Sequence, residues 1–148
     1  MLPRLVLPTL ADTRRFALIV ALTALVYALA GWVSLQVATY VAGVISAVWL
    51  AAGIGAMASL RFGLAGVAGV LLGSFAIISP VLPVEAAIRI ALGAAVGAAI
   101  MGYLPRYLQP FSHTLESVPS VAKFALVAAP FGCGVSALLG VFSLNSAG

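Results

Sequence analysis

Residues 84–104 read VEAAIRIALGAAVGAAIMGYL, a run long enough to cross a lipid bilayer as one helix, with two charges in its body. Glu85 and Arg89 are four residues apart, and the acid precedes the base, which is the favourable order for a helical pair. Gly93 and Gly97 continue the same spacing, so all four residues lie along one face. The Gly-x-x-x-Gly spacing allows a second helix to approach closely. The stretch therefore predicts a transmembrane helix with an ion pair and a packing face.

The composition of the whole chain is typical of a protein surrounded by lipid. Of its 148 residues, 64% are hydrophobic and 7% are charged, whereas water-soluble domains carry about 25% charged residues. The mean hydropathy is +1.26. The net charge of +4 does not indicate nucleic-acid binding, because no basic stripe is interleaved with exposed aromatic residues. Since Cys133 is the single cysteine, an internal disulfide is excluded.

Uncharged runs between the ionisable residues set the expected number of spans. A spanning helix needs about 20 apolar residues to cross about 30 Å of hydrocarbon. The run from Phe16 to Leu60 is long enough for two helices, and each of the three later runs for one. We therefore predict an all-α fold, a polytopic transmembrane helical bundle with five spans. The expected spans are residues 16–37, 41–60, 64–78, 84–104 and 121–144.

Polar residues and prolines mark the expected ends of these spans. Gln36 to Tyr40 is expected to form a short polar turn, and Pro105 to close the fourth span. The basic start of the chain followed by an apolar run resembles a signal peptide, which we interpret as a retained signal anchor. The predicted units are a cytoplasmic N-terminal segment (1–15), a five-helix transmembrane domain (16–144) and an external tail (145–148).

The distribution of cations predicts the orientation in the membrane. Lysine and arginine accumulate on the cytoplasmic side of membrane proteins. A cytoplasmic N-terminus places all the cations except Arg89 on one side: Arg4, Arg14, Arg15, Arg61, Arg106 and Lys123. After five crossings the C-terminus is then outside. These features predict a multi-pass protein of a bacterial inner (cytoplasmic) membrane.

Small residues recur at helical spacing in the last three predicted spans. They are Gly63, Gly66, Gly69 and Gly73 in the third, Gly93 and Gly97 in the fourth, and Gly132, Ser136 and Gly140 in the fifth. Because the hydrophobic effect does not drive helices together in lipid, close backbone contact must do so. We expect these three spans to pack tightly against one another. The alternative is that glycine and alanine are simply common in membrane helices.

Two interpretations of the charged pair remain open. In the first, Arg89 lies inside the bundle, where with Glu85 it binds an anion or responds to voltage or pH. Alternatively, Arg89 extends to the outer interface, where Glu85 neutralises it. A shallow position, about five residues into the span, and a ready partner favour the second interpretation.

A kink is expected at Pro130, because proline removes a backbone donor and frees the carbonyl of Leu126. Cys133 and Ser136 follow it, so a polar pocket there is one possibility and ordinary packing is the other. Trp49 lies in the middle of the second span and should face protein or a lipid-filled space, with Gly53 one turn later.

The sequence gives little indication of catalysis. Three carboxylates and one histidine, His113 in a predicted loop, supply no paired acid and base for one pocket. No spacing typical of metal ligands occurs. We therefore predict no enzyme activity, no metal and no cofactor. No internal repeat is apparent, which disfavours a small transporter component.

Several apolar motifs resemble the membrane-associated sensor (MASE-type) domains of bacteria. They are Trp49-Leu50-Ala51-Ala52-Gly53-Ile54, Phe62-Gly63, Gly73, Ala91-Leu92-Gly93, Leu138-Leu139-Gly140-Val141 and Ser143-Leu144. The resemblance covers roughly residues 25–144 and implies a helical membrane scaffold. Such domains usually have about eight spans and precede a cytoplasmic output domain, whereas five spans are expected here, with the end outside.

Two functions follow as hypotheses. The leading one is a non-catalytic membrane subunit that docks through small-residue helix faces within a larger complex. Its expected partners are lipids and other integral membrane proteins, in a homo- or hetero-oligomer. The alternative is a sensor that binds a small ligand or lipid-soluble signal in a pocket among spans two to four.

Overall fold

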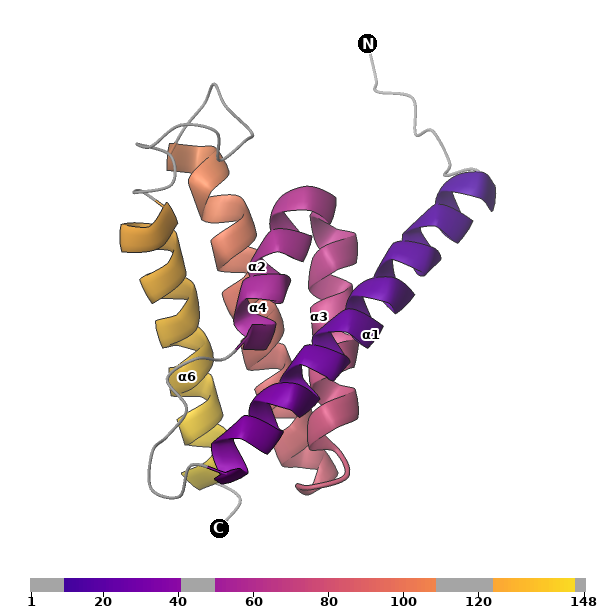
Figure 1. The fold of residues 1–148 in the computed structure, drawn as a ribbon. Coiled ribbons are helices and arrows are strands. Elements are labelled where there is room, and N and C mark those ends of the chain that lie inside the picture. Colours follow the sequence, from indigo (N-terminus) through magenta and orange to yellow (C-terminus); the bar gives the residue numbers. More distant parts are fainter. Residues whose placement is uncertain (1–9, 41–49, 109–123, 146–148) are drawn as a thin grey trace.

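The computed structural model describes residues 10–40, 50–108 and 124–145, and these residues form helices joined by short turns, without strands (Figure 1). The all-α prediction is therefore confirmed for this part of the chain. The elements are α1 (Leu10–Tyr40), α2 (Leu50–Phe62), α3 (Leu64–Ile78), α4 (Val84–Leu108), a π-helical turn η1 (Phe124–Ala128) and α6 (Ala129–Asn145).

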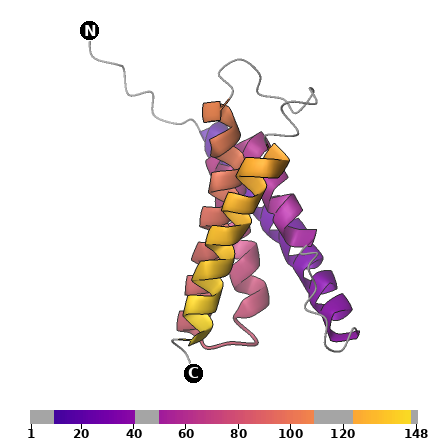
Figure 2. The ribbon, with the colours of Figure 1, turned by 90° about the vertical axis from the view of Figure 1, so that its left-hand side faces the viewer.

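Successive helices run in alternating directions (Figure 1). The turn between α2 and α3 lies at the end of the bundle where α1 begins, and the turn between α3 and α4 lies at the opposite end (Figures 1 and 2). α3 packs most extensively on α1, and α4 on α6, while α4 also contacts α2 and α3. α1 crosses its neighbours obliquely.

Two predicted helix ends were wrong. Gln36 to Tyr40 is helical rather than a turn, since this segment holds neither glycine nor proline to interrupt the helix. α4 continues through Pro105 to Leu108, because a proline removes a single backbone donor and membrane-type helices tolerate that loss. By contrast, α3 occupies the predicted residues, Leu64–Ile78.

The irregular backbone expected at Pro130 lies one turn earlier. The π-helical turn Phe124–Ala128 precedes α6, and Pro130 is the second residue of α6. Because proline has no N–H for the carbonyl of Leu126 and its ring crowds that carbonyl, a wider turn before it relieves the clash.

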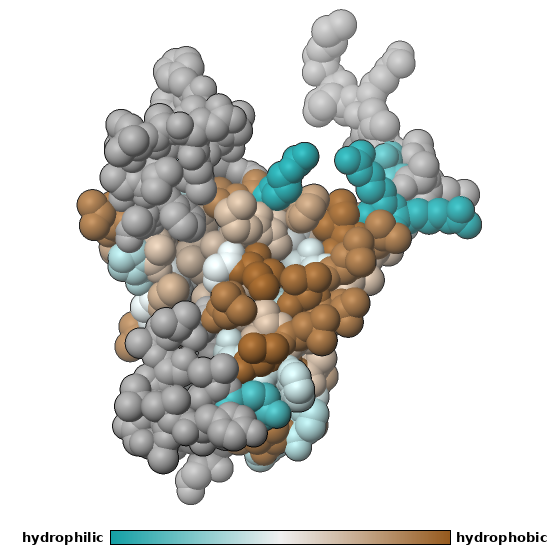
Figure 3. All heavy atoms as spheres, viewed as in Figure 1, coloured by the Kyte–Doolittle hydropathy of each residue, from teal (hydrophilic) through white to brown (hydrophobic). Residues whose placement is uncertain are grey.

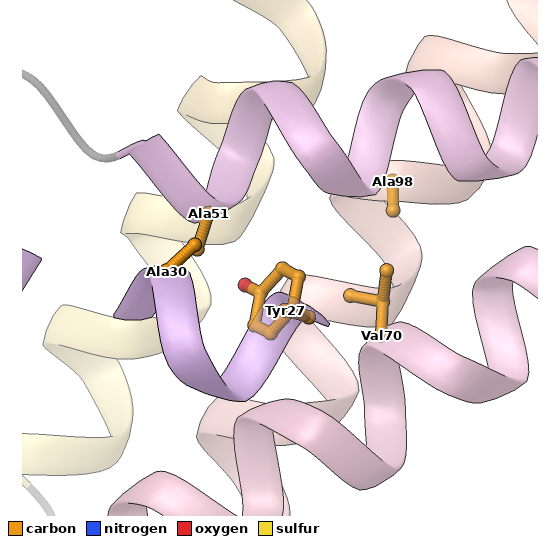
Figure 4. Packing of buried hydrophobic residues seen from close by; sticks show 5 residues of the cluster. All are labelled: Tyr27, Ala30, Ala51, Val70 and Ala98. Atoms are coloured by element: carbon orange, nitrogen blue, oxygen red, sulfur yellow. The ribbon is translucent and has the colours of Figure 1, made fainter. Parts of the chain in front are cut away.

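Small side chains fill the interior of the bundle. Among the described apolar residues that are buried, only Tyr27, Val70 and Met101 are larger than alanine. Tyr27 of α1, Val70 of α3 and Ala98 of α4 form one buried cluster with Ala30 and Ala51, in which the hydroxyl end of the Tyr27 ring lies toward Ala30 and Ala51 (Figure 4). Such an interior brings backbones close together, as is typical of helix packing in lipid.

Large apolar side chains lie on the outside instead. α1 exposes leucine, valine and aromatic side chains along its length, and α6 exposes Phe131, Leu138 and Phe142. Hydrophobic residues cover the sides of the helices in Figure 3, and hydrophilic residues gather where α1 begins. This size distribution, with small residues inside and large apolar residues outside, is the reverse of that in a water-soluble domain.

Two of the described helices are long and apolar enough to cross a membrane: Asp12–Gln36 and Val84–Pro105. The other apolar helical segments are shorter, at Leu50–Phe62, Leu64–Ile78 and Leu126–Phe142.

Gly63 alone separates α2 from α3. Its φ of 58° and ψ of −127° belong to a region open to glycine but closed to residues with a Cβ. Its N–H donates to the carbonyl of Ser59 at 2.9 Å, and its own carbonyl accepts from the N–H of Val67 at 3.1 Å. One residue therefore reverses the chain with its backbone hydrogen bonds satisfied.

Replacing Gly63 with alanine should destabilise the fold by about 1–3 kcal/mol, because the added Cβ strains this backbone conformation. The measurement is the thermal midpoint of unfolding in detergent. Gly134→Ala is the matched control, since a Cβ at Gly134 meets no heavy atom within 4 Å; it should gain roughly 0.5–1 kcal/mol from helix propensity. A Gly63→Ala variant as stable as its parent would contradict the strained turn.

Candidate functional site

The contact between α4 and α6 is made by backbone. A Cβ placed on Gly97 would lie 2.7 Å from the carbonyl oxygen of Gly132 and 3.0 Å from Cβ of Ser136. A Cβ on Gly132 would lie 2.8 Å from the carbonyl oxygen of Gly97. One turn earlier in α4, Gly93 faces Cβ of Leu139, 3.0 Å from its own Cβ position. The two helices thus touch where neither has a side chain.

Gly140, predicted to belong to the same packing face, does not take part. A Cβ at Gly140 would meet no heavy atom within 4 Å. Ser136 and Gly132 precede it at four-residue intervals and do contact α4. The close contact between α4 and α6 therefore reaches Leu139 but does not include Gly140.

α4 packs on both α3 and α6, as predicted, but α3 makes no extensive contact with α6 among the described residues. The glycines within α3, Gly66, Gly69 and Gly73, pack on α1 and α2 instead. A Cβ on Gly66 would clash with the backbone of Ala58 in α2. On Gly69 it would lie 3.0 Å from the carbonyl oxygen of Val20 in α1, and on Gly73 2.7 Å from that of Ala24. The tight turn at Gly63 folds α3 back along α2, and this places its glycines away from α6.

A second small-residue face of α4 was missed by the sequence analysis. A Cβ on Gly102 would lie 2.5 Å from Cβ of Ser59 in α2. Ser59 is fully buried, and its hydroxyl donates to the carbonyl of Gly55 at 2.8 Å. The available signal was a set of small residues at three- and four-residue intervals: Ala87, Ala91, Ala95, Ala98 and Gly102.

A cavity of about 290 Å³ lies among the helices. All five helices contribute to its lining, which is largely apolar. The lining residues with polar side chains are Tyr27 of α1, Ser74 of α3, and Cys133 and Ser136 of α6. Tyr27 and Ser74 are buried, whereas Cys133 is exposed. Hydroxyl and thiol groups on apolar walls suit a neutral, largely apolar molecule with one or two polar atoms.

The structure brings some of the predicted pocket residues together and not others. Cys133, Ser136 and Gly97 line this cavity, but the exposed Pro130 does not. Gly53 instead lines a separate groove between α1 and α2. Trp49 lies outside the described residues.

The charged pair is at the surface. Nη2 of Arg89 lies 3.7 Å from Oε2 of Glu85, and the two side chains are 46% and 87% exposed. Both residues belong to the first two turns of α4, next to the turn that follows α3. This geometry agrees with the interfacial interpretation of the pair, in which the charges remain near water.

Comparisons with known proteins supply no relative, since no protein-family model, curated protein or solved structure matches the chain. The resemblance to MASE-type sensor domains therefore stays a prediction. Within residues 10–40, 50–108 and 124–145, no three His, Cys, Asp or Glu side chains come together as a metal site.

Gly97→Leu should separate α4 from α6, because a leucine side chain would overlap the backbone of Gly132. We expect a loss of about 1–3 kcal/mol, as for other overpacked sites, measured by thermal unfolding in detergent. Gly140→Leu is the matched control on the facing helix, where the added side chain meets open space, and its midpoint should stay near that of the parent. Equal midpoints for the two variants would contradict this packing.

Proposed function

We propose that the chain is an integral membrane protein that crosses the bilayer five times, with its N-terminus in the cytoplasm. The distribution of side-chain size supports this proposal most directly: alanine and glycine occupy the interior, and large apolar residues face outward. Exposing such an exterior to water would cost free energy, whereas contact with lipid would not. The two helices of spanning length agree with the same environment.

The arrangement of charge supports the orientation. Arg14 and Arg15 lie near the start of α1, and Arg61 lies in the last turn of α2, at the same end of the bundle (Figure 1). At the opposite end Arg89 has an acidic partner, Glu85. The excess of cations at the first end favours a cytoplasmic location for it.

Cysteine labelling in intact cells tests this topology. In a Cys133→Ala background, Thr13→Cys reports on the start of α1, and Val81→Cys, at a position 73% exposed, reports on the turn between α3 and α4. A membrane-impermeant maleimide should label Val81→Cys directly and Thr13→Cys only after permeabilisation. The reverse pattern would contradict the orientation, and direct labelling of both would contradict an odd number of crossings between them.

Within the membrane, the chain serves as a non-catalytic subunit that docks against another integral membrane protein through α6. α6 packs on α4, and none of α1, α2 and α3 makes an extensive contact with it among the described residues. Figure 2 views the side on which α6 lies. Its outer face carries Phe131, Gly134 and Leu138 at helical spacing, all exposed.

Gly134 makes this face suitable for a partner helix. A Cβ at Gly134 would meet no atom within 4 Å, so its backbone is open between two large side chains, Phe131 and Leu138. A small residue flanked by large ones forms a depression into which a neighbouring helix can pack. The inner glycines of α4 and α6 are already used within the chain, which leaves this outer face for association.

A second candidate function is a sensor that binds a small apolar molecule in the central cavity. The observation that favours it is the cavity itself, whose lining includes Tyr27, Ser74 and Ser136. Its volume of about 290 Å³ is near the lower limit of ligand sites, roughly 300 Å³.

Purification in a mild detergent separates the two functions. The subunit proposal expects one membrane protein to co-purify in fixed ratio, and Gly134→Leu to lower its recovery about tenfold by overpacking the contact. Gly53→Leu, at another glycine with an open Cβ position, is the control that should retain the partner. Neither variant should lower the thermal midpoint of the parent. A monodisperse 15.0 kDa monomer without partner would contradict the subunit proposal; stabilisation of that monomer by an apolar compound would favour the sensor.

A further inference from the structure

A second hollow on the molecule, a groove of about 560 Å³, lies between α1 and α2. Leu22 and Val26 of α1 form one wall, and Ile54 and Met57 of α2 form the other. Gly53 lies in the lining without a side chain. Figure 3 views the face on which α1 and α2 lie, where hydrophobic residues extend below hydrophilic ones.

The polar end of the groove carries a cation. Arg61, in the last turn of α2, lines the groove together with its neighbour Phe62. The guanidinium carbon of Arg61 lies 5.9 Å from the centre of the Phe62 ring, a cation–π contact that holds the charge beside the groove. Arg14 and Arg15 belong to the same end of the bundle, at the start of α1.

The length of the groove matches one leaflet of a bilayer. From Leu50 to Arg61, its α2 wall rises roughly 16 Å along the helix. One leaflet contributes about 15 Å of hydrocarbon. An acyl chain lying along the groove would therefore have its headgroup at the level of Arg61, where a guanidinium can bind two phosphate oxygens at once.

We infer that this groove binds one anionic phospholipid, with an acyl chain between α1 and α2 and the phosphate against Arg61. The inference rests on the proposed membrane location of the chain. An apolar channel alone would accept any lipid, and a surface arginine alone would accept any anion. The combination selects a lipid with net negative charge, as basic pockets between membrane helices do.

Binding of phosphatidylglycerol to the delipidated chain, counted by native mass spectrometry, tests the inference. The parent should retain one phosphatidylglycerol in preference to phosphatidylcholine. Arg61→Gln should weaken retention about fivefold, which is the effect of one cation near an anionic lipid. Gly53→Phe should weaken it by filling the groove, and it should fold normally because the Cβ position at Gly53 is open. Arg89→Gln, at the opposite end, is the charge control and should retain the lipid.

Several outcomes would overturn the inference. Equal retention of phosphatidylcholine would show that charge does not select the lipid. Unchanged retention in Gly53→Phe would show that the lipid does not lie in the groove. Displacement by inorganic phosphate alone would show that the acyl chain does not contribute to binding. Carbonate extraction of cell membranes separates this result from the larger proposal. A chain that resists extraction but shows no lipid preference refutes the groove alone, whereas a chain released by carbonate refutes the membrane location.

Discussion

Close contact between helix backbones is the constraint on which this structure depends. In lipid, burying a leucine gains little, because its surroundings are as apolar before packing as after it. Dispersion contacts increase when two backbones approach, and that requires residues without bulk on both sides. Gly97 against Gly132 and Gly66 against Ala58 satisfy this condition directly. The size of a side chain, more than its hydropathy, therefore decides whether it lies inside or outside.

The same preference for small residues has a second effect on the interior. Alanine and glycine allow close approach where two helices cross, but they leave space where the helices diverge. The central cavity is lined by residues of all five helices, among them Ala52, Gly55, Ala94, Gly97 and Ala98. The close helix contacts and the cavity thus both result from the small residues of the interior. Cys133 and Ser136, one turn apart on α6, also line this cavity.

Sequence reasoning predicted the helical elements well, because the length of an apolar run and the glycines and prolines at its ends are local features of the sequence. Leu64–Ile78 is the clearest case, bounded by Gly63 and by Ser79 with Pro80. The neighbours of each helix were harder to predict, since helical spacing identifies a face without identifying what covers it. The face of Gly69 and Gly73 was assigned to the wrong helices for this reason. The environment of the charged pair was also hard to predict: Glu85 and Arg89 suggested two opposite environments, and the exposure of both side chains agrees with the interfacial one.

The unequal lengths of α1 and α3 have a consequence for the surrounding bilayer. α1 has 31 residues, about 46 Å of helix, whereas the 15 residues of α3 give only about 22 Å. In the membrane location proposed above, with a hydrocarbon layer about 30 Å thick, the longer helix would incline and the shorter one would draw the headgroups inward. Hydrophobic mismatch of this kind carries a modest elastic cost per ångström, and a thinner membrane would lower this cost for α3 and raise it for α1. The bundle would deform its lipid annulus asymmetrically, with the thinnest bilayer beside α3 and its short connection to α2.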